Sequence, residues 1–454
     1  MLKFIVHKQN EKLKEEYQRA LGENASVLAA AQEGEALYAD SLGWLDTEVW
    51  ANARVVEKLQ KLAEKIRQEA DAFVLIGVGG SNNAARSVIE ALQRPGTPEI
   101  IYAGNTLSAN ALKKMLVRLK GKSVYIDCIA KNFETLEPGS SFRVLRKWLY
   151  ERYGERAAKR IIATGTKGSR LEEICAENGY TFLEFPENIG GRYTAMSNVG
   201  LLPMAVAGVD IEELVRGAHD MQMELRGERP HGAWAEARAE RAARAVQEKP
   251  GEKEVCGKLA GRNPAYQYAC MRNVLYGYGY RVEMLSSFEP QFRHFYKWWI
   301  QLFAESEGKD GKGLFPVASE YSEELHSVGQ FVQEGTPILF ETFLDVKGQQ
   351  DSLVVEADET LMASLADGFD YLDGKDFWSI NKIAYEATVA AHSGRVPCMT
   401  LEIGALDAYH FGQLFYFFQF ACYLSCKMAG VNPFDQPGVE AYKEKMFEAL
   451  GKDV

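Results

Sequence analysis

Cysteine is sparse in this sequence, and it is not arranged to form bridges or a metal site. Seven cysteines are scattered over 454 residues, with no Cys-x-x-Cys pair and no histidine partners at the spacing of a zinc site. An odd number of dispersed thiols is typical of reduced cysteines in a protein core. The sequence therefore argues against a disulfide framework and against structural zinc.

Positive charge and long apolar runs are lacking as well. The net charge is −11, so no basic stripe is available to neutralise the phosphates of a nucleic acid. The N-terminus has no apolar segment of the signal-peptide type, and no apolar run reaches the length that crosses a membrane. We therefore expect a cytoplasmic protein that binds neither nucleic acid nor membranes.

What the sequence has instead is an alternation of apolar runs with helical patterns. Residues 72–81 form an apolar run that ends in glycines, as a buried parallel strand before a tight turn would, and a helix is predicted over 84–92. This alternation predicts an α/β fold built on doubly wound parallel sheets. The further predicted strands are 99–103, 123–130, 160–164, 181–185, 280–286, 314–318, 338–346 and 398–403.

The length favours two domains, because a single core seldom grows beyond about 250 to 300 residues. We predict a polar, helical N-terminal segment over residues 1–40 and a first α/β domain over 41–210. A second α/β domain is predicted over 211–430, opening with a charged helical stretch at 211–248, and a C-terminal helix over 431–454.

A pair of glycines precedes an arginine at the start of an apolar stretch. Gly190 and Gly191 allow the backbone to approach a ligand closely, and Arg192 offers a planar set of donors for an oxyanion. Thr194 or Ser197 is placed to cap the helix that follows. The plainer interpretation is a tight turn with a surface arginine.

Three further polar segments that contain glycine follow in order along the chain. They are Glu305-Ser-Glu-Gly-Lys, Leu325-His-Ser-Val-Gly-Gln and Asn432-Pro-Phe-Asp-Gln-Pro-Gly. Together with the glycine pair before Arg192, they resemble the glucose-6-phosphate isomerase (phosphoglucose isomerase) family in its short bacterial form, over residues 41–450. The resemblance implies two sugar-isomerase (SIS-type) sandwich domains with a helical C-terminal tail. It also implies a homodimer with a shared active site.

The resemblance assigns catalysis to four residues. Glu305, expected on a turn after the aromatic helix 296–303, becomes the general base that moves a proton between C2 and C1 of an open-chain sugar. His326, expected at a helix start, becomes the acid/base that opens the sugar ring together with Lys443. Arg192 then balances the charge of a cis-enediolate, which can be worth about 3 kcal/mol.

Each of these residues has a plainer interpretation when the resemblance is set aside. Glu305 and Glu307 would be a solvated pair of carboxylates at a helix end, His326 a structural histidine, and Lys443 a solvent-facing charge. The isomerase scheme requires no metal and no nucleotide, so we expect no cofactor.

The resemblance also assigns the contacts to a small, anionic sugar. Ser81 would donate to the anion at C6 from the start of a helix, where negative charge is favoured. A dinucleotide site at Gly77-Val-Gly-Gly is disfavoured, because the third glycine of that fingerprint is missing. The predicted substrate-binding residues are Gly80, Ser81, Lys131, Asn132, Thr135, Gly191, Gln301 and Gln436.

The two loops expected to bind the anion depart from the family. Relatives place several hydroxyl side chains after the third strand, whereas this chain keeps only Thr135 there and adds the negative charge of Glu134. In the first loop, Asn82 and Asn83 follow the serine in place of the residues usual in the family. Each lost donor to a charged group costs about 1.5 to 3 kcal/mol.

We therefore expect an aldose–ketose isomerase for a hexose with an anion at C6, with glucose 6-phosphate to fructose 6-phosphate as the first candidate reaction. The altered loops keep a second candidate open, sulfoquinovose to 6-deoxy-6-sulfofructose, because a sulfonate monoanion accepts weaker hydrogen bonds. Mannose 6-phosphate is a further candidate substrate. A non-catalytic regulator that binds sugar phosphates is a remote alternative, since it would not need the base Glu305.

Overall fold

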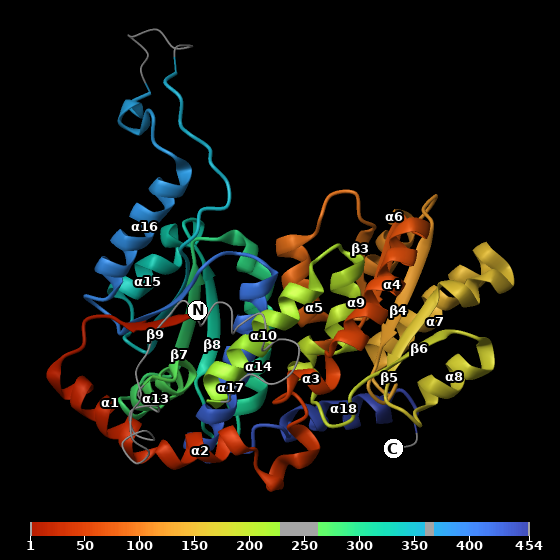
Figure 1. Ribbon diagram of the computed structural model, residues 1–454, viewed down its shortest axis with the longest axis horizontal. Coiled ribbons are helices and arrows are strands. Elements are labelled where there is room, and N and C mark those ends of the chain that lie inside the picture. Colours follow the sequence, from red (N-terminus) through yellow and green to blue (C-terminus); the bar gives the residue numbers. More distant parts are fainter. Residues whose placement is uncertain (1, 228–261, 359–366, 453–454) are drawn as a thin grey trace.

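Two five-stranded sheets form two lobes that lie side by side in the computed structural model (Figure 1). The structure describes residues 2–227, 262–358 and 367–452. The first sheet lies in the lobe on the right of Figure 1, and the second in the lobe on the left. The predicted α/β class with parallel sheets is confirmed.

The first sheet is entirely parallel, with strand order β3-β2-β4-β5-β6. Its strands are buried on both faces, so side chains that alternate along β2 enter different cores. Phe73 and Leu75 face helices α4, α5 and α9, whereas Val74 and Ile76 face α6, α7 and α8. The strands are β2 (Ala72–Ile76), β3 (Glu99–Ala103), β4 (Val124–Ile129), β5 (Ile161–Gly165) and β6 (Thr181–Glu184).

The second sheet has the order β1-β10-β9-β7-β8, and its first strand is antiparallel to the rest. Four of its strands were predicted: β7 (Val282–Ser287), β8 (Phe315–Glu320), β9 (Leu339–Val346) and β10 (Cys398–Ile403). The edge strand β1 (Lys3–Val6) corrects the prediction of a wholly helical segment over 1–40. Four residues carry no periodicity of their own, and β1 forms because the edge of β10 is open to it, with Lys3 opposite Glu402.

The two sheets are wound in the same way. Apart from the antiparallel edge strand β1, each sheet starts in an interior strand, adds a strand on one side and then continues on the other side. The winding reverses between β2 and β4 in the first sheet and between β7 and β9 in the second. Ligands of such sheets bind outside the carboxyl ends of the strands at this reversal. The loops after β2 and β4, at Gly77 and Lys131, therefore belong to one edge of the first sheet.

The helices cover the sheets and fill the space between the lobes. The long helix α17 is apolar on all sides and buried, and it packs against α10, α13 and α14. Trp298 on α14 meets Phe415 on α17 edge to face, with ring centroids 4.7 Å apart. Among the described residues, no helix combines the length and apolar composition needed to span a membrane.

The bounds of the helices differ from the predictions mainly at their ends. The helix predicted over 84–92 starts four residues earlier, and the charged stretch 211–248 is helical as far as Arg226, its remainder lying outside the described residues. The α-helices are α1 (Glu11–Glu23), α2 (Ala25–Glu33), α3 (Thr47–Trp50), α4 (Ala53–Glu69), α5 (Gly80–Leu92), α6 (Ala109–Arg118), α7 (Leu136–Tyr153), α8 (Arg170–Asn178), α9 (Asn198–Val206), α10 (Ile211–Arg226), α13 (Pro264–Gly277), α14 (Arg293–Glu307), α15 (Val328–Glu334), α16 (Phe377–His392), α17 (Ala408–Ala429) and α18 (Pro437–Ala449).

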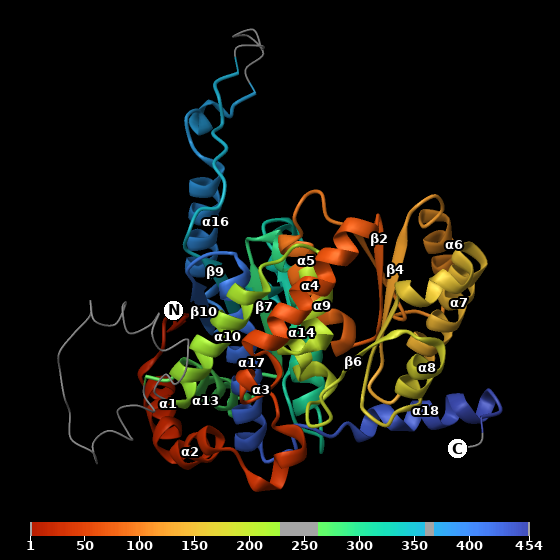
Figure 2. The same cartoon turned by 45° about the vertical axis from the view of Figure 1, so that its right-hand side comes forward.

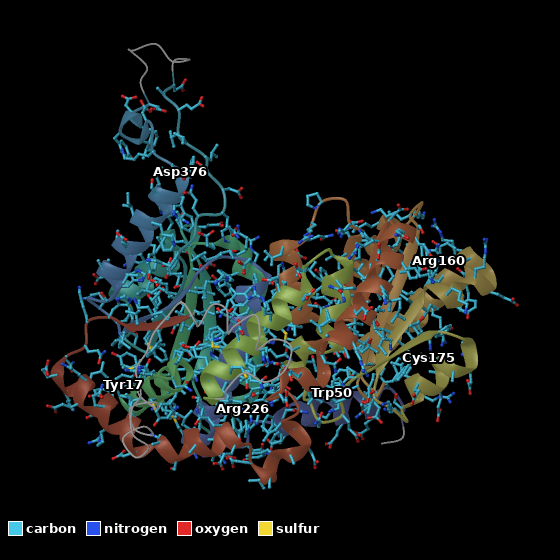
Figure 3. All side chains as sticks on the ribbon, viewed as in Figure 1. Tyr17, Trp50, Arg160, Cys175, Arg226 and Asp376 are labelled. Carbon is cyan, nitrogen blue, oxygen red and sulfur yellow. The ribbon has the colours of Figure 1, made fainter. Side chains whose placement is uncertain are left out.

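Residues 347–358 and 367–376, between β9 and α16, project away from both lobes as an arm (Figures 1 and 2). Asp376 lies at its root, where it caps α16 by accepting from the backbone of Trp378 (Figure 3). Large apolar side chains of the arm are exposed to solvent, among them Leu353, Phe369 and Tyr371.

The cysteines lie in the interior, as predicted. Six of them fall within the described residues, and each is buried as a free thiol. Cys175 on α8 lies in the outer layer of the first lobe (Figure 3). Burial raises the pKa of its thiol to about 12, which leaves it protonated and unreactive at neutral pH.

Candidate active site

Two glycine loops from different parts of the chain touch at the junction of the lobes. A Cβ atom at Gly80 would lie 1.9 Å from the carbonyl oxygen of Gly191 and 2.7 Å from the amide nitrogen of Arg192. Only a glycine fits there, because no side chain can occupy that space. The loop after β2 therefore packs directly on the turn that carries Arg192, which places two of the predicted binding residues side by side.

Arg192 lies in a short 3-10 turn, Gly191–Met196, and its guanidinium is buried rather than on the surface. Its Nε donates to Ser306 Oγ at 2.8 Å, and one terminal nitrogen donates to Glu305 Oε1 at 2.9 Å and to Gln436 Oε1 at 3.3 Å. The other terminal nitrogen donates to the carbonyl of Pro433 at 2.7 Å. The arginine thus joins α14 to the segment that leads into α18.

One of the two residues predicted to cap the following helix, Ser197, does so. Ser197 accepts from the backbone amide of Val199 at the start of α9. Thr194 instead donates to the carbonyl of Gly191 at 2.8 Å and so closes the turn around Arg192. The two hydroxyls therefore hold the conformation of the loop and do not face a ligand through these contacts.

Glu305 occupies the last turn of α14, which corrects its prediction on a turn after the helix. The helix continues to Glu307 because that side chain is buried and paired with Arg272. The carboxylate of Glu305 accepts from Arg192 on one oxygen and from Gln301 Nε2, at 3.0 Å, on the other. Its side chain stays 23% exposed and borders a cavity of about 380 Å³, together with Gln436.

Glu307 is not half of a solvated carboxylate pair. The guanidinium of Arg272 contacts both of its oxygens and also donates to Glu283 Oε2 at 2.6 Å. Tyr268 and Thr342 donate to the remaining oxygen of Glu283, at 2.6 Å and 2.8 Å. This buried cluster anchors the end of α14, so the two glutamates of the motif divide into an anchor and an accessible carboxylate.

Gln301 connects this carboxylate to the loop after β2. Its Oε1 accepts from Asn83 Nδ2 at 3.0 Å while its Nε2 donates to Glu305. Asn83 was expected only as a departure from the family, with no role of its own. Lys309 was also missed, although it pairs with Asp435 at 2.8 Å. The positions of Asn83 and Lys309 next to the motifs were the only signals in the sequence.

Lys131, predicted to bind the anion, forms hydrogen bonds with the backbone of its own chain. Its ammonium donates to the carbonyls of Glu187 at 2.7 Å and Ile189 at 3.1 Å. Burial lowers its pKa from the ordinary lysine value. Lys131 therefore fixes the segment before the glycine pair. It also borders a cavity beside the loop that follows β4.

The loop after β4 and the helix α18 enclose a cavity of about 340 Å³. Asn132 and Thr135 lie on one side of it, and Lys443 and Gln436 on the other. Thr135 stands at the N-terminus of α7, but its hydroxyl makes no capping hydrogen bond. It is thus placed to donate to a ligand, at a helix end that favours negative charge.

Two residues give this loop its unusual character. Phe133 has a positive φ of 56°, a region in which non-glycine residues are uncommon, and its ring packs edge to face on Phe142 at 5.8 Å. Glu134 is exposed and borders the same cavity as Thr135. The acidic side chain predicted to disturb anion binding is therefore at the cavity. Ser81 lies in the first turn of α5, after the neighbouring strand β2.

His326 lies apart from this constellation. It ends the 3-10 turn Glu323–His326, just before α15 and so close to the helix start predicted for it, and its side chain is exposed. Arg293 contacts Glu320 at 2.8 Å, so the start of α14 lies at the carboxyl end of β8, just before the histidine. Glu305 follows twelve residues later on α14, about 18 Å along the helix. Within one chain the two side chains stand at opposite ends of α14.

The arrangement holds one accessible carboxylate next to a buried cation. In the described part of the chain, no group of three or more His, Cys, Asp or Glu side chains is placed to hold a metal ion. The chemistry that these residues offer is proton transfer by Glu305 beside Arg192, with amide donors from Gln301 and Gln436.

Comparison with known proteins gives a consistent result. The family model described as phosphoglucose isomerase matches residues 17–230. A glucose-6-phosphate isomerase from Exiguobacterium sibiricum is 40% identical over 436 residues, which cover 93% of this chain and 90% of that protein. One from Bacillus cereus is 41% identical over 426 residues, which cover 91% of this chain and 87% of that protein.

Two solved structures share the fold at lower identity. A hypothetical protein from Thermus thermophilus has a TM-score of 0.82 at 22% identity, over 99% of this chain and 100% of that one. A glucose-6-phosphate isomerase from Chlamydia trachomatis has a TM-score of 0.77 at 18% identity, over 99% of this chain and 88% of that one. The relatives from Exiguobacterium sibiricum and Bacillus cereus are both glucose-6-phosphate isomerases, so the sulfoquinovose alternative gains no support.

Proposed function

Because this chain belongs to the phosphoglucose isomerase family, a family of aldose–ketose isomerases, we propose that it interconverts glucose 6-phosphate and fructose 6-phosphate. The observation that carries the proposal is the accessible carboxylate of Glu305, paired with the buried Arg192 at 2.9 Å and bordering a cavity. Only the cation of this pair is enclosed, which leaves the carboxylate open to a substrate.

Glu305 is the general base. It takes the proton from C2 of the open-chain aldose while the C1 carbonyl becomes an enediolate oxygen. The same carboxyl group then returns the proton to C1, while the proton of the C2 hydroxyl moves to the oxygen at C1, so that C1 carries a hydroxyl and C2 becomes the ketone. The hydrogen bonds from Arg192 and Gln301 hold the carboxylate through both steps.

Arg192 supplies the positive charge beside the reacting carbons. Ser306 and Pro433 accept from its other donors, so the guanidinium cannot swing away when the charge of the enediolate develops. A donor fixed in advance costs no reorganisation during the reaction. Gln436, which shares a guanidinium nitrogen with Glu305, borders both cavities and is the donor we assign to the sugar hydroxyls.

The anion at C6 is bound where the loops after β2 and β4 meet. Ser81, Asn132 and Thr135 supply the polar groups on the loops, and Lys443 on α18 lines the same cavity as Asn132 and Thr135. Lys443 is the cation that we assign to both the anion and the ring-opening step. Phosphate binding therefore depends on α18 remaining in place.

The active site is completed by a second copy of the chain. The turn of His326 follows Glu320, which contacts Arg293 at the far end of α14 from Glu305, so His326 cannot open the ring of a sugar held at its own Glu305. The arm between β9 and α16 presents exposed apolar residues that a partner would cover, including Leu353 and Phe369. In a homodimer, the partner supplies its own histidine to each site.

The boundary between the two sheet domains falls near residue 210, where α10 begins.

The test is proton NMR of the purified protein in D2O with glucose 6-phosphate and sulfoquinovose offered separately. We expect deuterium to enter at C2 as fructose 6-phosphate forms. Conversion of the sulfonate in place of the phosphate would overturn the substrate assignment. Binding of the phosphate sugar without any exchange at C2 would overturn the proposal that the protein is an enzyme, and it would favour a non-catalytic regulator.

A further inference from the structure

An amide hydrogen-bond chain crosses from the first lobe to the base in the second. Asn83 Nδ2 donates to Gln301 Oε1 at 3.0 Å, and Gln301 Nε2 donates to Glu305 Oε2 at 3.0 Å. We propose that Asn83 is a positioning residue that orients the Gln301 amide toward the general base. The inference rests on the proposed function, because it gives Asn83 a role in the same proton transfer.

The two ends of an amide differ in their hydrogen bonding. Gln301 stabilises the carboxylate only when its NH2 group faces Glu305, since a carbonyl oxygen in that place would repel it. In this orientation the carbonyl oxygen of Gln301 faces Asn83, whose NH2 group donates to it. Asn83 therefore stabilises the orientation of Gln301 that serves the carboxylate.

The neighbouring glycine makes room for the Gln301 side chain. Gly79 has a φ of 57°, and a Cβ atom there would lie 2.7 Å from Gln301 Nε2. The NH2 group of Gln301 therefore occupies space that a side chain at position 79 would fill, while Asn83 donates to the oxygen. Since Arg192 holds the other oxygen of Glu305, the carboxylate has one fixed donor on each oxygen.

Two other roles for Asn83 fit the contacts less well. A donor to the C6 anion would need the NH2 group that Gln301 already occupies. A purely structural residue would resemble the preceding Asn82, which is buried and donates to the carbonyl of Gly77 at 3.4 Å within its own loop. Asn83 is instead half-buried and reaches another lobe, where its contact ends on the base.

The first test compares three variants at Asn83. In Asn83→Leu and Asn83→Ala the orienting donor is lost, and we expect kcat to fall about threefold to tenfold, the range of one neutral hydrogen bond, with little change in KM. Asn83→Asp has the same shape but only accepts hydrogen bonds, so Gln301 must turn its NH2 group away from Glu305. We expect the aspartate variant to lose more activity than the leucine variant.

The second readout is specific to the proton transfer. With glucose 6-phosphate carrying deuterium at C2, the primary isotope effect on kcat should rise in all three variants, because proton abstraction becomes slower relative to the other steps. Asn178→Leu is the matched control. It removes another asparagine side-chain hydrogen bond, to the carbonyl of Ile174, at an exposed position on α8 far from the site. Its isotope effect should equal that of the wild type.

A double-mutant cycle shows whether Asn83 acts through Gln301. In a Gln301→Met background, Asn83→Leu should change the residual kcat by less than about twofold, since coupled residues are non-additive. Equal losses in both backgrounds would overturn the inference, as would unchanged kcat and isotope effects in the Asn83 variants. A wild-type protein that exchanges no proton at C2 would instead overturn the proposed function, so the two failures are distinguishable.

Discussion

Arg192 and Glu305 form an ion pair at 2.9 Å across 113 positions of sequence, and only one of them is enclosed. The side chain of Arg192 is 2% exposed, whereas that of Glu305 is 23% exposed. The enclosed cation is held by three further partners, and the carboxylate opens on a cavity. This asymmetry separates a cation that is fixed by the protein from a carboxylate that a substrate can reach.

Replacing the base should stop proton transfer without unfolding the protein. Glu305→Gln keeps the shape of the side chain and can still accept from Arg192, but it cannot take a proton. We expect kcat to fall at least about 100-fold, with substrate affinity by calorimetry close to that of the wild type. Deuterium entry at C2 is the measurement, and retained exchange would show that another group is the base. Glu323→Gln, on the exposed 3-10 turn before α15, is the matched control.

The contact between the two glycine loops should be required for activity. In Gly80→Ala, the new Cβ atom would overlap the carbonyl of Gly191 and displace the turn of Arg192. A misplacement of about 1 Å can cost roughly 100-fold in rate, so we expect kcat/KM to fall by that order. Gly139→Ala in α7 meets no atom within 4 Å and should leave activity unchanged. Similar kinetics for the two variants would contradict the close packing.

The stability of the first lobe should depend on pH through Asp127. This carboxyl group is fully buried on β4, with Thr164 donating to one oxygen at 3.2 Å, and burial raises its pKa to about 7. Between about pH 4 and pH 7 the folded state therefore binds more protons than the unfolded state, so the free energy of unfolding falls as pH rises through this range.

Asp127→Asn should remove that slope, because an amide does not ionise. We expect the variant to be more stable than the wild type at pH 8, by up to about 4 kcal/mol, and similar to it at pH 4. Urea unfolding at both pH values measures the difference. A variant that is equally destabilised at pH 4 and pH 8 would show that Asp127 serves only as a packing element.

Removing the acidic side chain from the anion loop should improve the use of a phosphate sugar. Glu134 borders the cavity with Thr135 and Lys443, where its charge opposes a dianion. We expect Glu134→Thr to lower KM for glucose 6-phosphate about fivefold, corresponding to about 1 kcal/mol for a solvated charge pair, and the effect should shrink in high salt. Glu151→Thr, exposed near the other end of α7, should leave KM unchanged. An unchanged KM in Glu134→Thr would place its charge away from the bound anion.

Much of the fold was predictable because it follows from local sequence. The apolar runs at 99–103 and 398–403 became strands with the predicted bounds, since a buried parallel strand needs continuous apolar residues on both faces. Helix ends were less predictable. The helix of Glu305 runs on to Glu307 because Arg272, 35 positions earlier, buries and pairs that residue.

Part of the candidate site was also predictable from the sequence, and part was not. Glu305, Arg192, Gln301 and Gln436 were named from the sequence, and the fold brings them into one hydrogen-bonded group. The contact of Asn83 with Gln301 was not predicted, because nothing near Asn83 in the sequence shows that its loop touches α14. The residues that hold the site together contact one another between the lobes, and no local sequence pattern predicts such contacts.

Hydrophobic periodicity and residue chemistry are local properties, so the amino-acid sequence accounts for the two sheets, the buried helices and the identity of the polar residues at the motifs. Other features arise only in the folded chain: Lys131 binds backbone carbonyls, β1 completes the second sheet, and His326 stands apart from Glu305. Each of these depends on a partner distant in sequence, and the free energy of such a contact exists only once the chain has folded.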